Sequence, residues 1–163
     1  MPVVSNTSPI LNLAIVNQLI LLHHQFDEIL IPEVVLDELK INEERPGSQN
    51  IREAISAGWI RTQSVGNQTL IQLLNQTLDQ GESEAIALAI ELQADWLLLD
   101  EREGRKVAKS LGLKVTGILG VLLRAKQIGE LQSLQPVIDD LTNKAGFRIA
   151  PDLLAQILTQ KGQ

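Results

Sequence analysis

The 163-residue sequence has no cysteine and no tyrosine, and it contains only two tryptophans and two phenylalanines. Without cysteine the chain forms neither a disulfide framework nor a thiolate metal site. So few aromatic rings argue against a platform that stacks successive bases. No apolar run approaches the ~20 residues of a membrane-spanning helix, and the N-terminus lacks the pattern of a secretory signal. We therefore expect a cytoplasmic protein that does not enter a membrane.

Basic residues are fewer than acidic ones, 14 against 20, which gives a net charge of −6 and a pI near 4.9. This balance argues against binding nucleic acid by bulk attraction. The charge is uneven, however. Residues 101–126 contain seven basic and two acidic residues, so one basic segment lies on an acidic body.

Short apolar runs alternate with helical patterns along the chain, which predicts an α/β domain with a largely parallel sheet. The proline positions suit the first turns of helices, and Ser8 before Pro9 is a good N-cap. The expected strands are 2–5, 28–31, 95–99 and 113–116, and the expected helices are 9–23, 32–43, 81–93, 101–111 and 117–129.

The polar stretch 42–50 is too short for a domain linker, so it predicts a loop or helix break. The tail, 131–163, predicts two further helices around Phe147–Ala150. We expect a single domain over 1–163, with a core over about 1–130 and a C-terminal helical extension over about 131–163.

Acidic and amide side chains recur where an open α/β sheet binds ligands, at the carboxyl ends of strands and on the helices that follow. Their oxygens are the ligands that Mg²⁺ and Mn²⁺ prefer. The two adjacent histidines, by contrast, point to different helix faces and cannot share a metal. The candidate metal ligands are Asn6, Glu38, Glu82, Glu84, Asp100 and Glu101.

Each candidate also has a structural explanation. Asn6 is a favourable helix cap, and Glu82 and Glu84 complement the dipole of a helix that begins at Gly81. Asp100 is either a cap for the next helix or a ligand. Glu38 faces the core if its stripe contains Ile41, which would require a partner or cation, and faces solvent if the buried stripe contains Leu39 instead.

A basic stripe begins beside the last acidic pair, at helical spacings of i, i+3, i+4 and i+7. It predicts either a surface that holds phosphates near a bound metal or an ordinary solvated helix face. The residues are Arg102, Arg105, Lys106 and Lys109.

Five segments, in order and in register, resemble the PIN-domain superfamily, in a bacterial and archaeal branch related to VapC-type toxin ribonucleases. They are "VVSNTSPILNLA", "ILIPEVVLDEL", "GESEAIALA", "LLLDEREGRKVA" and "LKVTGILGVLLRAK". The resemblance covers roughly Val3 to Lys126, and "GFRIAPDLLAQIL" in the tail fits that branch more loosely.

The resemblance implies a three-layer α/β/α PIN-like fold whose acids bind Mg²⁺ or Mn²⁺ and hydrolyse phosphodiester bonds in RNA. It implies Glu38, Glu84 and Asp100 as catalytic residues, with Glu82 competing with Glu84 and Glu101 with Asp100. Thr7 and Ser8 match family hydroxyls. These two, with Arg102, Arg105, Lys106 and Lys109, are the expected nucleic-acid-binding residues.

The family's first acidic position is normally aspartate, and here it is Asn6. An amide oxygen still coordinates a hard cation, but without the negative charge, so metal affinity and activation of the nucleophile should weaken. We expect a toxin-like, metal-dependent endoribonuclease impaired to that extent. Its expected partners are RNA, a cognate antitoxin protein and a second copy of the chain. The alternatives are a non-catalytic PIN-like module that binds RNA or protein, and a structural partner that dimerises through its helices.

Overall fold

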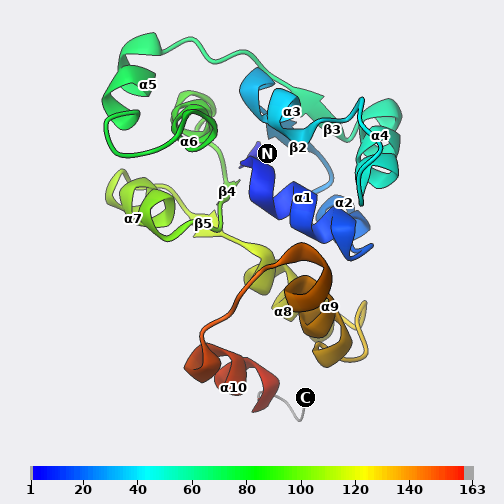
Figure 1. The fold of residues 1–163 in the computed structure, drawn as a ribbon. Helices are drawn as coiled ribbons and strands as arrows, with labels where there is room; N and C mark the ends of the chain where they lie inside the picture. Colours follow the sequence, from blue (N-terminus) through cyan, green and yellow to red (C-terminus); the bar gives the residue numbers. More distant parts are fainter. Residues whose placement is uncertain (1, 160–163) are drawn as a thin grey trace.

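The computed structural model describes residues 2–159, the side chain of residue 159 excepted. Its five strands form one parallel sheet in the order β3-β2-β1-β4-β5 (Figure 1). Val4 of β1 pairs with Leu30 of β2 and Leu97 of β4, so β1 is central. The strands are β1 Val3–Ser5, β2 Ile29–Ile31, β3 Ile60–Thr62, β4 Trp96–Leu98 and β5 Val115–Thr116.

Helices connect the strands and extend beyond the last one. They are α1 Thr7–Ile15, α2 Ile20–Phe26, α3 Glu33–Leu39, α4 Ser48–Ala57, α5 Gln68–Leu74, α6 Gln80–Leu92, α7 Arg102–Ser110, α8 Ile118–Gln127, α9 Gln135–Ala145 and α10 Pro151–Thr159. Within residues 2–159, no helix has the length and apolar character needed to cross a bilayer.

The sheet has a hydrophobic core on each face, because successive residues of a strand point to opposite sides. Val3 and Leu98 join a core formed with α1, α2, α4, α8 and α9. Val4 and Leu97 join a second core formed with α5, α6 and α7. Figure 1 shows helices on both sides of the sheet. The α/β class and the parallel sheet predicted from the sequence are therefore confirmed.

The prediction of one continuous helix over 9–23 is wrong. The structure has α1 and α2 there, separated by a turn in which Asn17 has a φ of 61°. The first helix also begins two residues earlier than predicted, so Asn6 and not Ser8 occupies its N-cap position. The helix predicted over 32–43 ends at Leu39, because Lys40 adopts the left-handed conformation with a φ of 54°.

The sequence reading missed three elements: α4, β3 and α5. The polar segment 42–50 is a loop only as far as Gly47, and α4 begins at Ser48. Strand β3 lies at the edge of the sheet and buries Ile60 alone, so it lacks an apolar run long enough to recognise. Helix α5 starts at the polar Gln68, capped by the side chain of Asn67.

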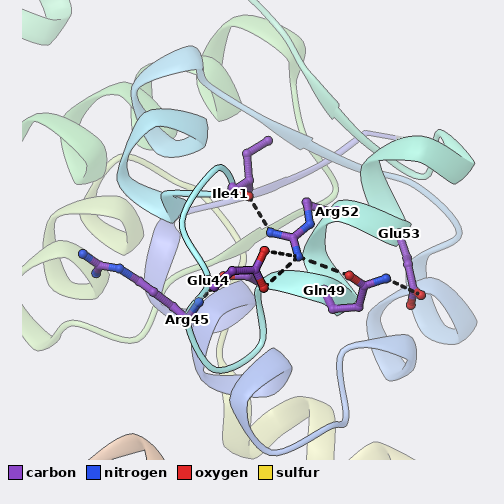
Figure 2. Close-up of polar contacts among 7 residues, drawn as sticks. Ile41, Glu44, Arg45, Gln49, Arg52 and Glu53 are labelled. Carbon is purple, nitrogen blue, oxygen red and sulfur yellow. Dashed lines mark hydrogen bonds and ion pairs between the residues drawn. The ribbon is translucent and has the colours of Figure 1, made fainter.

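The loop between α3 and α4 is fixed by a polar network centred on Arg52 (Figure 2). Its guanidinium donates to the carbonyl oxygen of Ile41 at 2.7 Å and to the side chain of Gln49 at 3.1 Å. It also pairs with Glu44 at 3.1 Å. These contacts hold the turn that follows α3, the helix that carries Glu38.

The two helices predicted in the tail are present as α9 and α10. Leu141 of α9 and Ile157 of α10 are buried in the core that contains Val3 and Leu98. The connecting segment is anchored where the N–H of Phe147 donates to the carbonyl oxygen of Leu141 at 2.9 Å. The tail therefore packs against the same face of the sheet as α1 and α8.

Candidate active site

The carboxyl ends of β1 and β4 bring the first and last candidate ligands together. Ser5 and Leu98 are partners in the parallel register, and the N–H of Asn6 donates to the carbonyl oxygen of Leu98 at 3.0 Å. Because parallel strands end at one edge of the sheet, the residues after β4 emerge beside Asn6.

Glu101 is the acid that contacts the Asn6 segment. Its Oε2 accepts from Nδ2 of Asn6 at 3.3 Å, and its Oε1 accepts from the hydroxyl of Ser8 at 2.7 Å. Asn6 is buried at the N-cap position of α1, but its side chain makes no capping bond. The buried Oδ1 of Asn6 has no hydrogen-bond partner. The side-chain amide of Asn6 therefore bonds to the carboxylate of Glu101 and does not cap α1.

Glu38 approaches the same place from α3. Val35 and Leu39 are buried and Glu38 is exposed, so the stripe that contains Leu39 faces the core. The hydroxyl of Thr7 donates to Oε1 of Glu38. A Cβ built on Gly81 would lie 2.6 Å from Oε1 of Glu38 and 3.1 Å from Oδ1 of Asn6. Both oxygens thus lie over the backbone of Gly81, and a larger residue there would push the Glu38 carboxylate away from Asn6.

Glu82, at the start of α6, is buried with 6% of its surface exposed. It forms a capping box with Asp79: its N–H donates to Oδ1 of Asp79 at 2.8 Å, and its Oε1 accepts from the N–H of Asp79 at 3.2 Å. Burial raises the pKa of Glu82, and the negative charges of Asp79, Glu101 and Glu38 raise it further against the lowering effect of that hydrogen bond. Glu82 therefore lies within the electrostatic reach of three other acids, Asp79, Glu101 and Glu38.

Glu84 lies two residues further along α6, on nearly the opposite side of the helix. Its carboxylate accepts from the side chain of Gln80 in an exposed contact. Glu82 is therefore the acid of α6 whose pKa responds to Glu38 and Glu101, whereas Glu84 contacts Gln80.

Asp100 faces the start of α8. Its Oδ1 accepts from the N–H of Ile118 at 3.0 Å, so it caps a helix, although not the next one along the chain. Burial raises the pKa of Asp100 to about 6; the Ile118 hydrogen bond and Arg105 lower it, and Glu101 raises it. Its Oδ2 is buried without a hydrogen-bond partner.

The basic stripe lies on α7, directly after Glu101. Arg105 is half-buried and donates to the carbonyl oxygen of Leu99 at 2.8 Å. Arg102, Lys106 and Lys109 are exposed. Thr7 and Ser8, expected among the nucleic-acid-binding residues, donate to Glu38 and Glu101 respectively. We call Glu38, Glu82 and Glu101 the acidic cluster.

The acidic cluster matches a hard divalent cation in the chemistry of its donors. Of the ion pairs formed within residues 2–159, none involves Glu38, Glu82 or Glu101. The available donors are carboxylate oxygens and the unpartnered amide oxygen of Asn6, the types that Mg²⁺ and Mn²⁺ take. In the described part of the chain, no three carboxylates or histidines are arranged to hold an ion by themselves. A cation at this place would therefore need the unpartnered amide oxygen of Asn6 in addition to carboxylates.

Sequence reasoning did not identify Asp79, Gly81 or Gly117 as parts of the site. The capping box was readable, because Asp79 precedes Glu82 by three residues. The glycines have no such signal. A Cβ on Gly117 would lie 2.3 Å from Oδ1 of Asp100, a conflict visible only in three dimensions.

The raised pKa of Asp100 makes stability depend on pH. Its folded value of about 6 exceeds the ordinary value of 3.8, so the ionised form opposes folding above pH 6 and this penalty is relieved as the pH falls towards 4. Two pKa units correspond to roughly 3 kcal/mol. Asp100→Asn, which retains an oxygen for Ile118, should raise the melting temperature at pH 7.5 in EDTA and flatten its change between pH 4 and 6. An unchanged pH profile would contradict this.

The fold and site together define a three-layer α/β protein with an oxygen-donor cluster at the carboxyl ends of its central strands. A family profile described as "PIN domain" matches residues 2–163. The chain belongs to the PIN-domain family, whose members are generally nucleases. No curated protein matches the sequence closely enough to count as a relative.

Proposed function

We propose that the protein is a divalent-metal-dependent endoribonuclease that hydrolyses phosphodiester bonds. The observation that carries the proposal is the approach of Glu38 and Glu101 to Asn6, with Glu82 close enough for both charges to raise its pKa. Within residues 2–159 none of these three acids forms an ion pair. Their negative charges repel one another, and a bound cation would offset that repulsion. A basic helix that begins beside the cluster suits a polyanionic substrate.

Mg²⁺ or Mn²⁺ would be held by the Oδ1 of Asn6 together with Glu38, Glu82 and Glu101. These carboxylates would have to draw closer than the structure places them, because no three carboxylates of the described residues are arranged to hold an ion. When bound, the ion supplies an activated water and stabilises the charge that develops on the phosphate. The hydroxyls of Thr7 and Ser8 orient Glu38 and Glu101. The exposed Arg102, Lys106 and Lys109 hold the substrate backbone.

This assignment differs from the one that the resemblance implied. Glu82 replaces Glu84, which bonds to Gln80, and Glu101 replaces Asp100, which caps α8. Glu38 keeps its place. Asp100 and Arg105 then position the segment after β4 and do not bind the ion.

RNA as substrate and a VapC-like toxin role rest on the resemblance of the motifs. A cytoplasmic location, a cognate antitoxin and a homodimer belong to the same proposal. The Asn6 amide favours the second candidate, a non-catalytic PIN-like module that binds RNA or protein, because it brings no charge to the metal.

The test is cleavage of a 5′-labelled single-stranded RNA by the full chain in Mn²⁺, in Mg²⁺ and in EDTA, with Glu38→Gln as the matched variant. Cleavage in Mn²⁺ that EDTA abolishes and Glu38→Gln reduces by about 100-fold supports the proposal. RNA binding without cleavage in any metal would favour the non-catalytic module. Equal cleavage by Glu38→Gln would indicate a contaminating nuclease.

A further inference from the structure

A cavity of about 330 Å³ lies next to the acidic cluster, between the start of α8 and the segment that leads into α10. This volume lies within the range of pockets that bind small organic groups. Its walls come from three parts of the sequence: the segment around Asp100 and Arg105, residues 115–120, and residues 147–153. Asp100 adjoins Glu101 in the chain, so the cavity begins one residue from the proposed metal centre.

The walls combine positive charge with apolar surface. Two arginines, Arg105 and the exposed Arg148, line the cavity against the single acid Asp100, and Nη1 of Arg105 lies beside Gly117. Phe147 and Leu153 form an apolar wall, and Leu153 is 43% exposed although it is a large aliphatic side chain. A ligand with an anionic part and a flat apolar part would match both features.

Two glycines keep the floor of the cavity free of side chains. A Cβ on Gly117 would lie 2.3 Å from Oδ1 of Asp100 and 3.1 Å from Nη1 of Arg105. A Cβ on Gly120 would lie 2.3 Å from Oγ1 of Thr116. Any larger residue at either position would displace groups that line the cavity.

We propose that this cavity binds one unpaired nucleotide of single-stranded RNA, next to the phosphate that is cleaved. The base lies against Phe147 and Leu153, and the adjoining phosphate pairs with Arg105 and Arg148. A base in a duplex is stacked and paired, so it reaches such a pocket only by leaving the helix, whereas a single strand offers it directly. The inference rests on the proposed function and adds a binding site for the substrate that the C-terminal segment helps to form.

The experiment measures binding separately from cleavage. A fluorescently labelled single-stranded RNA decamer is titrated by anisotropy in EDTA with wild type, Ala150→Phe, Arg148→Gln and Arg61→Gln. Ala150→Phe narrows the cavity without a change in charge. Arg61→Gln removes the same charge as Arg148→Gln from β3, at the opposite edge of the sheet from β5.

We expect the two cavity variants to bind the decamer about tenfold more weakly than wild type, and Arg61→Gln to stay within twofold. The same decamer in a duplex should bind wild type and Ala150→Phe alike. Thermal melting of each variant shows that its fold is retained.

Unchanged decamer binding by both cavity variants, while wild type cleaves RNA in Mn²⁺, would overturn the nucleotide site and leave the nuclease function standing. Cavity-dependent binding with no cleavage in Mn²⁺ would support the site and count against the nuclease. Cavity-dependent binding of a poly-glutamate peptide in place of RNA would overturn the proposal in favour of an acidic protein partner.

Discussion

Replacement of Glu101 by glutamine is expected to lower Mn²⁺ affinity and metal-dependent RNA cleavage by about 100-fold or more. Glu101 joins Asn6 and Ser8 to the segment after β4, and in glutamine the amide oxygen can accept from Asn6 while the amide nitrogen donates to the hydroxyl of Ser8. The substitution therefore removes a negative charge from the cluster and leaves its framework in place. Calorimetric Mn²⁺ titration and the rate of RNA cleavage measure the two effects.

Asp100→Asn is the matched control, because it neutralises the neighbouring acid in the same segment. Since Asp100 accepts from Ile118 and not from the Asn6 segment, the variant should retain clearly more Mn²⁺ affinity than Glu101→Gln. If Asp100→Asn loses metal binding while Glu101→Gln keeps it, the assignment in the proposed site is reversed and the one implied by the resemblance holds.

Helix α6 offers a second pair under the same expectation. Glu82→Gln removes a buried charge that senses Glu38 and Glu101, whereas Glu84→Gln alters an exposed contact with Gln80. Only Glu82→Gln should weaken Mn²⁺ binding. It should also stabilise the metal-free protein, because the raised pKa of Glu82 reports a charge that folding disfavours.

The sequence predicted the architecture through features that depend on local pattern. Apolar runs predicted β1, β2, β4 and β5, and prolines marked the starts of helices within two residues. The elements it missed have no such pattern: β3 buries Ile60 alone, and the split between α1 and α2 depends on the positive φ of Asn17.

For the candidate site, the sequence supplied the residue types but not the partners. It left Glu82 and Glu84 as alternatives, because helical spacing shows that they face different sides without showing which side meets α3. It also left Asp100 and Glu101 as alternatives. Their tertiary contacts distinguish them, because Asp100 accepts from the N–H of Ile118 and Glu101 accepts from Asn6 and Ser8. Arg148 was beyond its reach, because the tail joins the cavity through a tertiary contact that no local pattern encodes.

Asn6→Asp is expected to have opposite effects on the protein with and without metal. Asn6 is 4% exposed, and its amide nitrogen donates to Glu101. Aspartate would lose that bond and add a fourth negative charge near Glu38, Glu82 and Glu101. The metal-free protein should lose about 1–3 kcal/mol of stability.

In Mn²⁺ the same charge becomes favourable, because a carboxylate replaces the neutral oxygen that now faces Gly81 unpartnered. Mn²⁺ affinity should rise by about 10- to 100-fold, since calcium- and magnesium-type sites tune affinity by ligand charge. The melting temperature of Asn6→Asp should therefore lie below that of wild type in EDTA and above it in millimolar Mn²⁺.

The exposed Asn143→Asp on α9 is the charge-matched control, and it should show no such reversal. A rise in RNA cleavage together with Mn²⁺ affinity would identify the amide as the group that limits a working nuclease site. A rise in affinity without cleavage would show that the cluster binds metal but performs no hydrolysis, which would favour the non-catalytic module. A lower melting temperature in both EDTA and Mn²⁺ would remove Asn6 from the metal site, because a charge beside a bound cation cannot remain purely destabilising.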